Sequence, residues 1–283
     1  MLLMIIAVLV VMGLCLGSFV NALVWRVHEQ EKQSSKKKPD KVYLKQLSVA
    51  KGRSMCPHCR HELAAKDLVP VLSWLNLGGK CRYCGKPVSI QYPLVELATA
   101  ALFVVSYLWW PVSFDTAQTV IFILWLALLT GLMALLVYDV RWFLLPNRIV
   151  YPLGAIAALQ AIISIASAND PGIALFNLIL AVAVGGGIFY LLFQVSHGKW
   201  IGGGDVKLGW LLGLIAATPA RSFLLIFVAS VGGSLVSLPL VARGRLKRTS
   251  LIPFGPFLII AVIIVQLFGA DILHWYRQTF ITY

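Results

Sequence analysis

The sequence predicts an all-helical membrane protein that spans the bilayer about eight times and carries one small polar domain. Three observations predict this class. Of 283 residues, 59% are hydrophobic and 12% are charged, whereas soluble domains are about 25% charged. Mean hydropathy is +0.85. The apolar residues form eight long runs, and the basic residues sort to one side of the topology that these runs define.

Most of the apolar runs have the length of a transmembrane helix, which needs about 20 residues. The runs cover approximately 2–25, 94–112, 117–138, 149–167, 172–195, 206–219, 222–242 and 252–270. The run 206–219 is short, so we expect it to extend or to pack against other helices in place of lipid. The first run has no basic residues before it and no small-residue cleavage site, and Arg26 follows it, so we interpret it as a retained helix and not a signal peptide.

The distribution of basic residues predicts the orientation. Eight spans place 22 of the 24 Lys and Arg residues on one side, including the Arg243–Arg248 cluster, and leave only Arg221 and Arg277 on the other. The positive-inside rule makes the rich side cytoplasmic and puts both termini outside. The net charge of +13 then reflects topology and attraction to the anionic lipid bilayer. Nucleic acid is not an expected partner.

The chain divides into three predicted parts. They are a first transmembrane helix at 1–25, a cytoplasmic loop domain at 26–93, and a seven-helix membrane domain at 94–283. Within the loop domain, residues 29–40 include Lys36-Lys37-Lys38-Pro39 and have the composition of a flexible, solvated linker. We expect ordered structure to resume near Met55.

Two CxxC pairs in the polar domain predict a metal site. They are Cys56-Pro57-His58-Cys59 and Cys81-Arg82-Tyr83-Cys84, and 21 residues separate Cys59 from Cys81. This spacing is typical of zinc ribbons, in which each pair supplies two thiolates to a tetrahedral Zn²⁺. Four thiolates close the coordination shell, so the zinc would be structural and would supply much of the folding free energy. The alternative is four unliganded cysteines.

The stretch Gly202-Gly203-Gly204-Asp205-Val206-Lys207 places a carboxylate beside three glycines between two apolar segments. An ionisable residue at a membrane boundary is costly and is by default functional. The glycines allow unusual backbone conformations and the close approach of another chain. As an alternative, Asp205 caps the following helix. Lys207 either snorkels to lipid phosphate or lowers the pKa of Asp205, and the residues do not decide between these.

Topology selects the partner of Asp205. Six acidic residues follow position 93, and three of them, Asp115, Asp170 and Asp271, fall on the outer side. Glu96 and Asp139 remain at the cytoplasmic ends of their helices. For Glu96 the structural alternative is a favourable interaction with the N-terminal helix dipole.

Asp139 closes a long apolar span and is the better partner. Two aspartates that share one proton can act as base towards a water and as acid towards a carbonyl, and so cleave an amide without a metal. No other nucleophile set is evident. The alternative is that Asp139 pairs with Arg141 or Arg148.

These residues together resemble the type IV prepilin peptidases, which are membrane aspartyl proteases of the GxGD kind. The resemblance rests on Asp139 with Leu144-Leu145-Pro146-Asn147, on the segment 202–207, and on Gly17-Ser18-Phe19-Val20-Asn21-Ala22 with Arg26. The segments 69–75 and 91–97, which flank the second cysteine pair, are similar to those of the bifunctional members. The match covers nearly the whole chain, in order.

The resemblance implies cleavage of type IV prepilin, pseudopilin or competence-pilin precursors at the cytoplasmic face of the bacterial inner membrane. It also implies N-methylation of the new N-terminus with S-adenosylmethionine. Asp139 and Asp205 map onto the catalytic pair and the four cysteines onto the zinc ligands, while Glu96 falls in the motif beside the methyltransferase part.

This chain departs from the family pattern at Arg141, where many members carry a second acid, and in its lysine-rich insert. One alternative is therefore a peptidase whose methyltransferase part is inactive. A second, from a different class, is a zinc-stabilised transporter or structural subunit. Transporters often show midplane polar residues and a repeated half, neither of which is evident.

Overall fold

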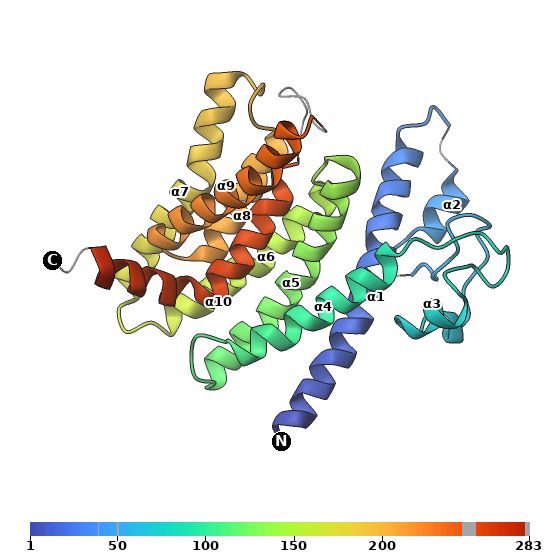
Figure 1. The fold of residues 1–283 in the computed structure, drawn as a ribbon, viewed down its shortest axis with the longest axis horizontal. Helices are drawn as coiled ribbons and strands as arrows, with labels where there is room; N and C mark the ends of the chain where they lie inside the picture. Colours follow the sequence, from blue (N-terminus) through green and yellow to red (C-terminus); the bar gives the residue numbers. More distant parts are fainter. Residues whose placement is uncertain (39, 50, 245–252, 281–283) are drawn as a thin grey trace. The chain divides into compact units, whose positions relative to one another are not determined.

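The computed structural model describes residues 1–283 except 39, 50, 245–252 and 281–283, and these described residues form helices with no strand (Figure 1). The helices are α1 (Leu2–Ser34), α2 (Lys41–Gln46), the 3₁₀ turn η1 (Ala65–Asp67), α3 (Leu72–Asn76), α4 (Gln91–Leu108), α5 (Thr116–Trp142), α6 (Asn147–Ala166), α7 (Pro171–Ser196), α8 (Gly203–Ala216), α9 (Pro219–Ala242) and α10 (Gly255–Phe280). The predicted all-helical class is confirmed.

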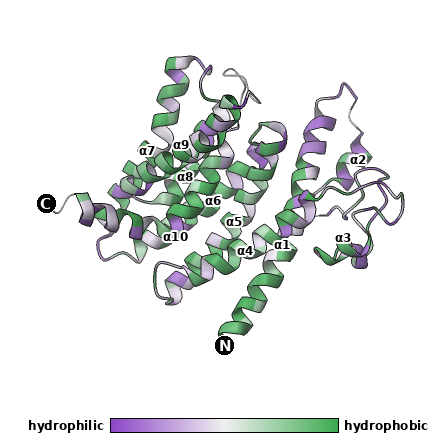
Figure 2. Cartoon of the chain, viewed as in Figure 1, coloured by the Kyte–Doolittle hydropathy of each residue, from purple (hydrophilic) through white to green (hydrophobic). Residues whose placement is uncertain are grey.

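Seven of these helices are long and apolar enough to cross a membrane: α1, α4, α5, α6, α7, α9 and α10. Figure 2 shows them as mainly hydrophobic ribbons. The eighth predicted span corresponds to α8, which has only 14 residues. At 1.5 Å per residue it is about 21 Å long, short of the roughly 30 Å hydrocarbon core. Helix α8 is therefore a short apolar helix packed among its neighbours.

The chain forms two compact units, Met1–Leu108 with Leu129–Ala134, and Trp109–Leu128 with Leu135–Tyr283. In the first unit, α1 and α4 run antiparallel with their backbones in close contact. A Cβ added to Gly17 would lie 2.6 Å from the Glu96 Cα, and one added to Gly13 would collide with Ala100. Further along, the Asn21 side chain donates to the Tyr92 carbonyl at 3.1 Å. Helix α4 thus belongs with α1, although the sequence-based division began a new domain at residue 94.

The polar segment after the first span is more ordered than predicted. Helix α1 continues to Ser34, and α2 begins after Asp40, whose carboxylate caps it through the backbone N–H groups of Val42 and Tyr43. The prediction of a flexible linker at 29–40 is therefore wrong for residues 29–34, which are helical. Pro39 lies outside the described residues.

Arg26 gives the physical reason for this order. Its guanidinium is buried in α1 and donates to the carbonyls of Ser48, Val49 and Gly52 at 3.0–3.3 Å. Gln30, one turn later, donates to the Leu47 carbonyl at 2.8 Å. A buried charge must be satisfied by hydrogen bonds, so Arg26 fixes the segment that leads to Cys56.

In the second unit, glycines hold the short helix α8 against α7. A Cβ on Gly213 would lie 2.8 Å from the Val182 Cα, and one on Gly209 would lie 2.5 Å from the Gly185 carbonyl oxygen. Gly209 and Gly213 form a GxxxG pair, which in membranes lets helix backbones approach and gain dispersion energy. The antiparallel α7–α8 pair brings the first turn of α8 to the same end of this unit as the C-terminal end of α7.

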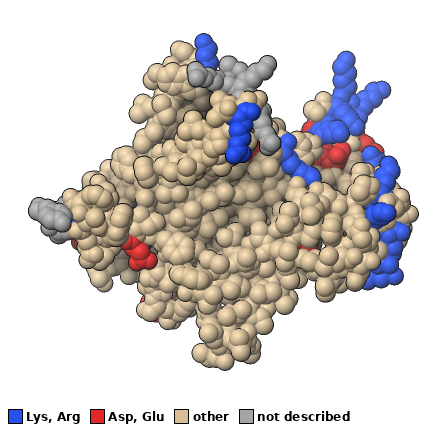
Figure 3. Space-filling view, in the orientation of Figure 1, with Lys and Arg blue, Asp and Glu red and all other residues tan. Residues whose placement is uncertain are grey.

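Basic side chains gather on particular elements of each unit. In the first unit they cover α2 and the cysteine-containing segment (Figure 3). In the second unit, Lys207 of α8 donates to Asn147 at 2.9 Å. Asn147 is the first residue of α6, so Lys207 lies beside the loop that joins α5 to α6. Most of the Arg243–Arg248 cluster lies outside the described residues.

The glycine contacts between α7 and α8 predict a selective loss of stability. Gly213→Ala should lower the free energy of unfolding by about 1–3 kcal/mol, because an extra methyl group in a tight interface forces the backbones apart. The control is Gly187→Ala on α7, where an added Cβ meets nothing within 4 Å. It should be neutral or stabilising by up to about 1 kcal/mol through helix propensity. Thermal unfolding of the purified variants in detergent checks this, and equal effects at the two positions would contradict it.

Candidate active site and metal centre

Asp139 lies in the last turn of α5, and its side chain is buried. Its carbonyl accepts the backbone N–H of Phe143 at 2.8 Å, and Phe143 adopts a left-handed conformation (φ 56°) that ends the helix. Arg141, a predicted alternative partner of Asp139, instead lies over the Trp142 ring, with its guanidinium carbon 5.6 Å from the ring centroid.

Asp205 is the third residue of α8 and is half-buried. The N-cap is Gly202, so the interpretation of Asp205 as the N-cap is wrong. The backbone N–H of Asp205 donates to the Gly202 carbonyl at 3.1 Å. A carboxylate in the first turn of a helix is favoured by the partial positive charge of the helix N-terminus.

The structure brings the two predicted aspartates together. They come from α5 and α8 of the same unit. A Cβ added to Gly255 would meet both the Asp139 carboxylate and, at 3.7 Å, Leu208 Cδ2, and Leu208 lies about one turn after Asp205 in α8. Sixty-five residues separate them in the chain. The arrangement has the chemical capacity of a carboxylate pair: one group can accept a proton while the other holds one.

The start of α10 also packs against Asp139, and the sequence analysis missed this contact. Gly255 is the first residue of α10, and a Cβ at this position would collide with the Asp139 carboxylate oxygen Oδ2. The side chain of Asp139 therefore occupies space that only glycine leaves open. The signal in the sequence is the Phe254-Gly255-Pro256 segment at the start of an apolar run.

The loop after α5 contacts the start of α8. A Cβ on Gly204 would lie 3.4 Å from Leu145 Cδ1, and Lys207 donates from Nζ to Asn147 Oδ1 at 2.9 Å. Neither role predicted for Lys207 describes this contact, in which Lys207 ties α8 to the start of α6. The two separate motifs, at 144–147 and 202–207, thus form one contact surface beside the aspartates.

The three glycines before Asp205 do not adopt unusual backbone conformations. None of Gly202, Gly203 and Gly204 has a positive φ, and Gly202 has φ −74°. An added Cβ would be 3.6 Å from the nearest heavy atom at Gly202 and 3.9 Å at Gly203. The predicted conformational role is therefore wrong, and what these glycines leave is open space next to Asp205.

The four predicted zinc ligands meet in the first unit. The sulfur atoms of Cys56, Cys59, Cys81 and Cys84 all lie within 4.8 Å of one another, and Cys56 Sγ and Cys84 Sγ are 3.9 Å apart. Four thiolates placed tetrahedrally at a Zn–S distance of about 2.3 Å would be about 3.8 Å apart. This donor set fits Zn²⁺.

Each CxxC pair lies on a turn of the same design. Cys56 donates its N–H to the His61 carbonyl at 3.0 Å and accepts from Arg60 at 2.9 Å. Twenty-five residues later, Cys81 makes the same two bonds with Lys86 and Gly85, each at 2.9 Å. The residue after the second cysteine of each pair has a positive φ, 59° at Arg60 and 67° at Gly85. The turns aim the sulfur atoms at a common point.

The cysteine thiols differ in their acidity. Burial raises the pKa of Cys56 to about 12. Burial acts in the same direction on Cys81, but backbone hydrogen bonds with Cys84 and Tyr83 outweigh it and lower the pKa to about 7. A set of four thiolates in this space therefore requires a cation.

Asp67, which the sequence analysis did not single out, fixes the second cysteine turn. It accepts from Arg82 Nε at 2.7 Å and from the Tyr83 hydroxyl at 2.9 Å. Burial acts to raise the pKa of Asp67, but these hydrogen bonds outweigh it and hold the pKa below its usual value. Asp67 therefore links η1 to the residues between Cys81 and Cys84.

Glu96 links α4 to the cysteine-containing segment. It lies beyond the first turn of α4, so the helix-dipole alternative does not describe it. Its Oε2 accepts a hydrogen bond from the Val71 N–H at 2.7 Å, and Glu96 as a whole residue is 6% exposed. Val71 has φ 60° and ψ −52°, a costly conformation for a β-branched residue. Strain of this kind persists only where surrounding contacts impose it.

Comparisons with known proteins agree with this layout. The family model of the bacterial peptidase A24 N-terminal domain matches residues 11–110, and that of the type IV leader peptidase family matches residues 120–238. The two matches define a membrane peptidase built from an N-terminal domain and a following peptidase domain.

Several curated proteins are similar over almost their full length. A prepilin leader peptidase/N-methyltransferase of Aeromonas hydrophila is 31% identical over 282 residues, covering 95% of this chain and 92% of that protein. Proteins of the same name from Bacillus subtilis and Pseudomonas aeruginosa are each 29% identical, covering 96% and 95% of this chain and 97% and 92% of their own lengths. No solved structure matches significantly. This chain belongs to the type IV leader peptidase family, which confirms the family predicted from the motifs.

Proposed function

We propose that this protein cleaves the leader peptides of type IV prepilins or pseudopilins at the cytoplasmic face of a bacterial inner membrane, with Asp139 and Asp205 as the catalytic residues. The observation that supports the proposal is that buried Asp139 and Asp205, in the first turn of α8, belong to the same unit, where Gly255 packs against both the Asp139 carboxylate and Leu208 of α8. Family membership supports the reaction, and the names of the relatives support the substrate class.

The two aspartates would work as a general acid and a general base. One carboxylate takes a proton from a water molecule as the water oxygen attacks the scissile carbonyl carbon. The protonated partner donates to the peptide, and collapse of the tetrahedral species breaks the C–N bond and releases a carboxylate and an amine. Such positioned proton transfers contribute about 10²–10⁴-fold each. Gly255 and the segment 144–147 would hold Asp139 and Asp205 in place.

We further propose that the new N-terminal amine is methylated with S-adenosylmethionine, which supplies an electrophilic methyl group when bound. The amine must lose a proton before its lone pair can form the N–C bond. The relatives' printed names include N-methyltransferase, and the N-terminal unit with its intact cysteine cluster favours two activities over a peptidase alone. The four cysteines would hold a structural Zn²⁺.

Substitution of either aspartate tests the peptidase proposal. Asp139→Asn and Asp205→Asn should each lower cleavage of a co-expressed prepilin by at least about 100-fold, because each removes one proton-transfer group. The control is Asp170→Asn, at the N-cap of α7, where asparagine caps equally well. Cleavage is measured by gel shift, and mass spectrometry of the product N-terminus reports methylation. Substantial cleavage by either variant would exclude the aspartate-pair mechanism.

Gly255→Ala tests whether the position of the Asp139 carboxylate matters. The added Cβ would displace Oδ2, and a displacement of about 1 Å can cost about 100-fold in rate. We therefore expect cleavage at least about tenfold slower. Gly232→Ala on α9 is the matched control, since its Cβ would meet only Phe257 at 3.7 Å. Equal cleavage rates for the two variants would contradict this role of Gly255.

The zinc proposal predicts roughly one Zn²⁺ per purified chain, as expected for four thiolates. A Cys81→Ser/Cys84→Ser variant should lose the metal and expose the segment between α2 and α4 to protease, because metal binding supplies folding free energy. The control is Cys15→Ser, in the apolar part of α1. Metal content is measured by plasma mass spectrometry, and a double variant that retained its zinc would refute the assignment.

A further inference from the structure

We infer that a cavity in the first unit, between α1, the cysteine turns and α3, binds S-adenosylmethionine, with Glu96 facing the positively charged part of the ligand. The inference rests on the methyltransferase activity proposed above and gives that activity a location. The cavity has a volume of about 140 Å³.

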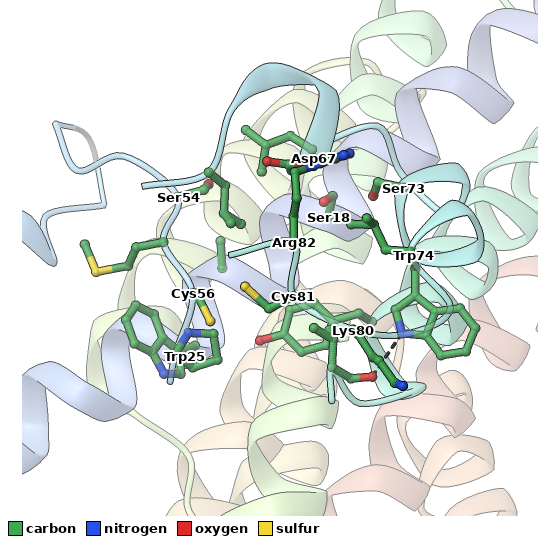
Figure 4. A pocket seen from close by; sticks show the side chains of 18 of the residues that line it. Ser18, Trp25, Ser54, Cys56, Asp67, Ser73, Trp74, Lys80, Cys81 and Arg82 are labelled. Atoms are coloured by element: carbon green, nitrogen blue, oxygen red, sulfur yellow. Dashed lines mark hydrogen bonds and ion pairs between the residues drawn. The ribbon is translucent and has the colours of Figure 1, made fainter. Parts of the chain in front are cut away.

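Two tryptophans make the walls of this cavity. Trp25 of α1 and Trp74 of α3 both line it and stand on opposite sides of it in Figure 4. Stacking on an aromatic ring is the general way in which proteins bind a base without reading its sequence. Aromatic faces also attract cations, and the sulfonium of S-adenosylmethionine is a cation.

The Trp74 ring is held in a fixed orientation. Its Nε1 donates to the Val88 carbonyl at 3.0 Å, and its six-membered ring packs so closely on Gly79 (φ 68°) that an added Cβ would lie 2.9 Å from it. A ring held on two sides loses little conformational entropy when a ligand stacks on it. The site is thus preorganised at this wall.

Glu96 supplies the negative charge. It lines the cavity and is 6% exposed, and in the described part of the chain it makes no ion pair. The other carboxylate that lines the cavity, Asp67, is paired with Arg82. A buried carboxylate is costly without a compensating cation. The sulfonium of S-adenosylmethionine, which S-adenosylhomocysteine lacks, would compensate Glu96.

Glu96 also connects the ligand to the shape of the cavity. It accepts the N–H of Val71, whose strained conformation begins α3, and α3 carries Ser73 and Trp74 into the cavity lining. Hydroxyl groups of Ser18, Ser54 and Ser73 add hydrogen-bonding capacity. One carboxylate therefore both faces the ligand and holds the loop that carries the Trp74 wall.

The cavity volume sets how much of the ligand is enclosed. Pockets that bury a whole drug-sized ligand measure about 300–1,000 Å³, so this cavity would enclose one part of S-adenosylmethionine and leave the remainder at its mouth. An exposed remainder suits a methyl donor, since the amine acceptor must reach the methyl group.

The test is direct binding to the purified, zinc-loaded full chain, measured by isothermal titration calorimetry with S-adenosylmethionine and with its neutral product S-adenosylhomocysteine. Glu96→Gln keeps an acceptor for the Val71 N–H but removes the negative charge. It should therefore lower the affinity for S-adenosylmethionine at least tenfold and the affinity for S-adenosylhomocysteine by less. Trp74→Leu should lower the affinity for both ligands at least about tenfold, since base stacking contributes about 1–3 kcal/mol. Trp74→Phe, which keeps an aromatic ring, should lose less affinity than Trp74→Leu.

Two controls match these variants. Glu62→Gln removes an exposed carboxylate of the same cysteine segment, and Trp200→Leu removes an exposed indole of the second unit. Neither should change binding. Zinc content and thermal unfolding of each variant separate loss of the site from loss of the fold.

A second measurement needs no variant. Ultraviolet cross-linking of radiolabelled S-adenosylmethionine to the wild-type chain should label peptides within residues 18–26 or 54–96. Label confined to the second unit, or wild-type affinity in both Glu96→Gln and Trp74→Leu, would overturn the location. A wild-type chain that bound neither ligand and gave unmethylated pilin would instead refute the methyltransferase proposal itself.

Discussion

Close approach of helix backbones at glycine is the constraint on which most of this structure depends. Between helices in a bilayer, burial of apolar area gives little net force, so association relies on packing and hydrogen bonds. Gly13 and Gly17 bring α1 against α4, and Gly209 and Gly213 bring α8 against α7. Each contact then positions a carboxylate of a candidate site. Glu96 lies directly opposite Gly17, and Asp205 lies one turn before Gly209.

The same constraint explains why a 14-residue helix can carry half of a candidate active site. Helix α8 is too short to span the bilayer, but most of its residues are buried by neighbouring helices. Its N-terminus therefore lies beside the last turn of α7 and near the end of α5, while its C-terminus ends part-way along α7. The position of a carboxylate at this place is fixed by packed helix backbones and not by a loop. This suits a reaction that requires fixed geometry.

Features with a strong local signal could be predicted from the sequence. The spacing of Cys56, Cys59, Cys81 and Cys84 specified the cluster because few chemistries need four thiols in that pattern. The expected pairing of Asp139 with Asp205 came from the predicted topology. Contacts that depend on shape could not be predicted in this way. The segment Phe254-Gly255-Pro256 marks the start of an apolar run, but the sequence does not tell that Gly255 packs on Asp139 or that Glu96 accepts the Val71 N–H. Both contacts join segments that are brought together only by folding.

The glycines before Asp205 show that the sequence can reveal a glycine without revealing why glycine is needed there. The sequence suggested backbone freedom, yet Gly202, Gly203 and Gly204 have ordinary conformations and room for a side chain. At Gly17, Gly213 and Gly255 the fold itself excludes a Cβ; at Gly202 and Gly203 it does not. If three glycines are required beside Asp205, the requirement must come from something outside the chain. An extended peptide laid across the first turn of α8 would fill that space, and it would do so where its carbonyl carbon could meet the aspartate pair.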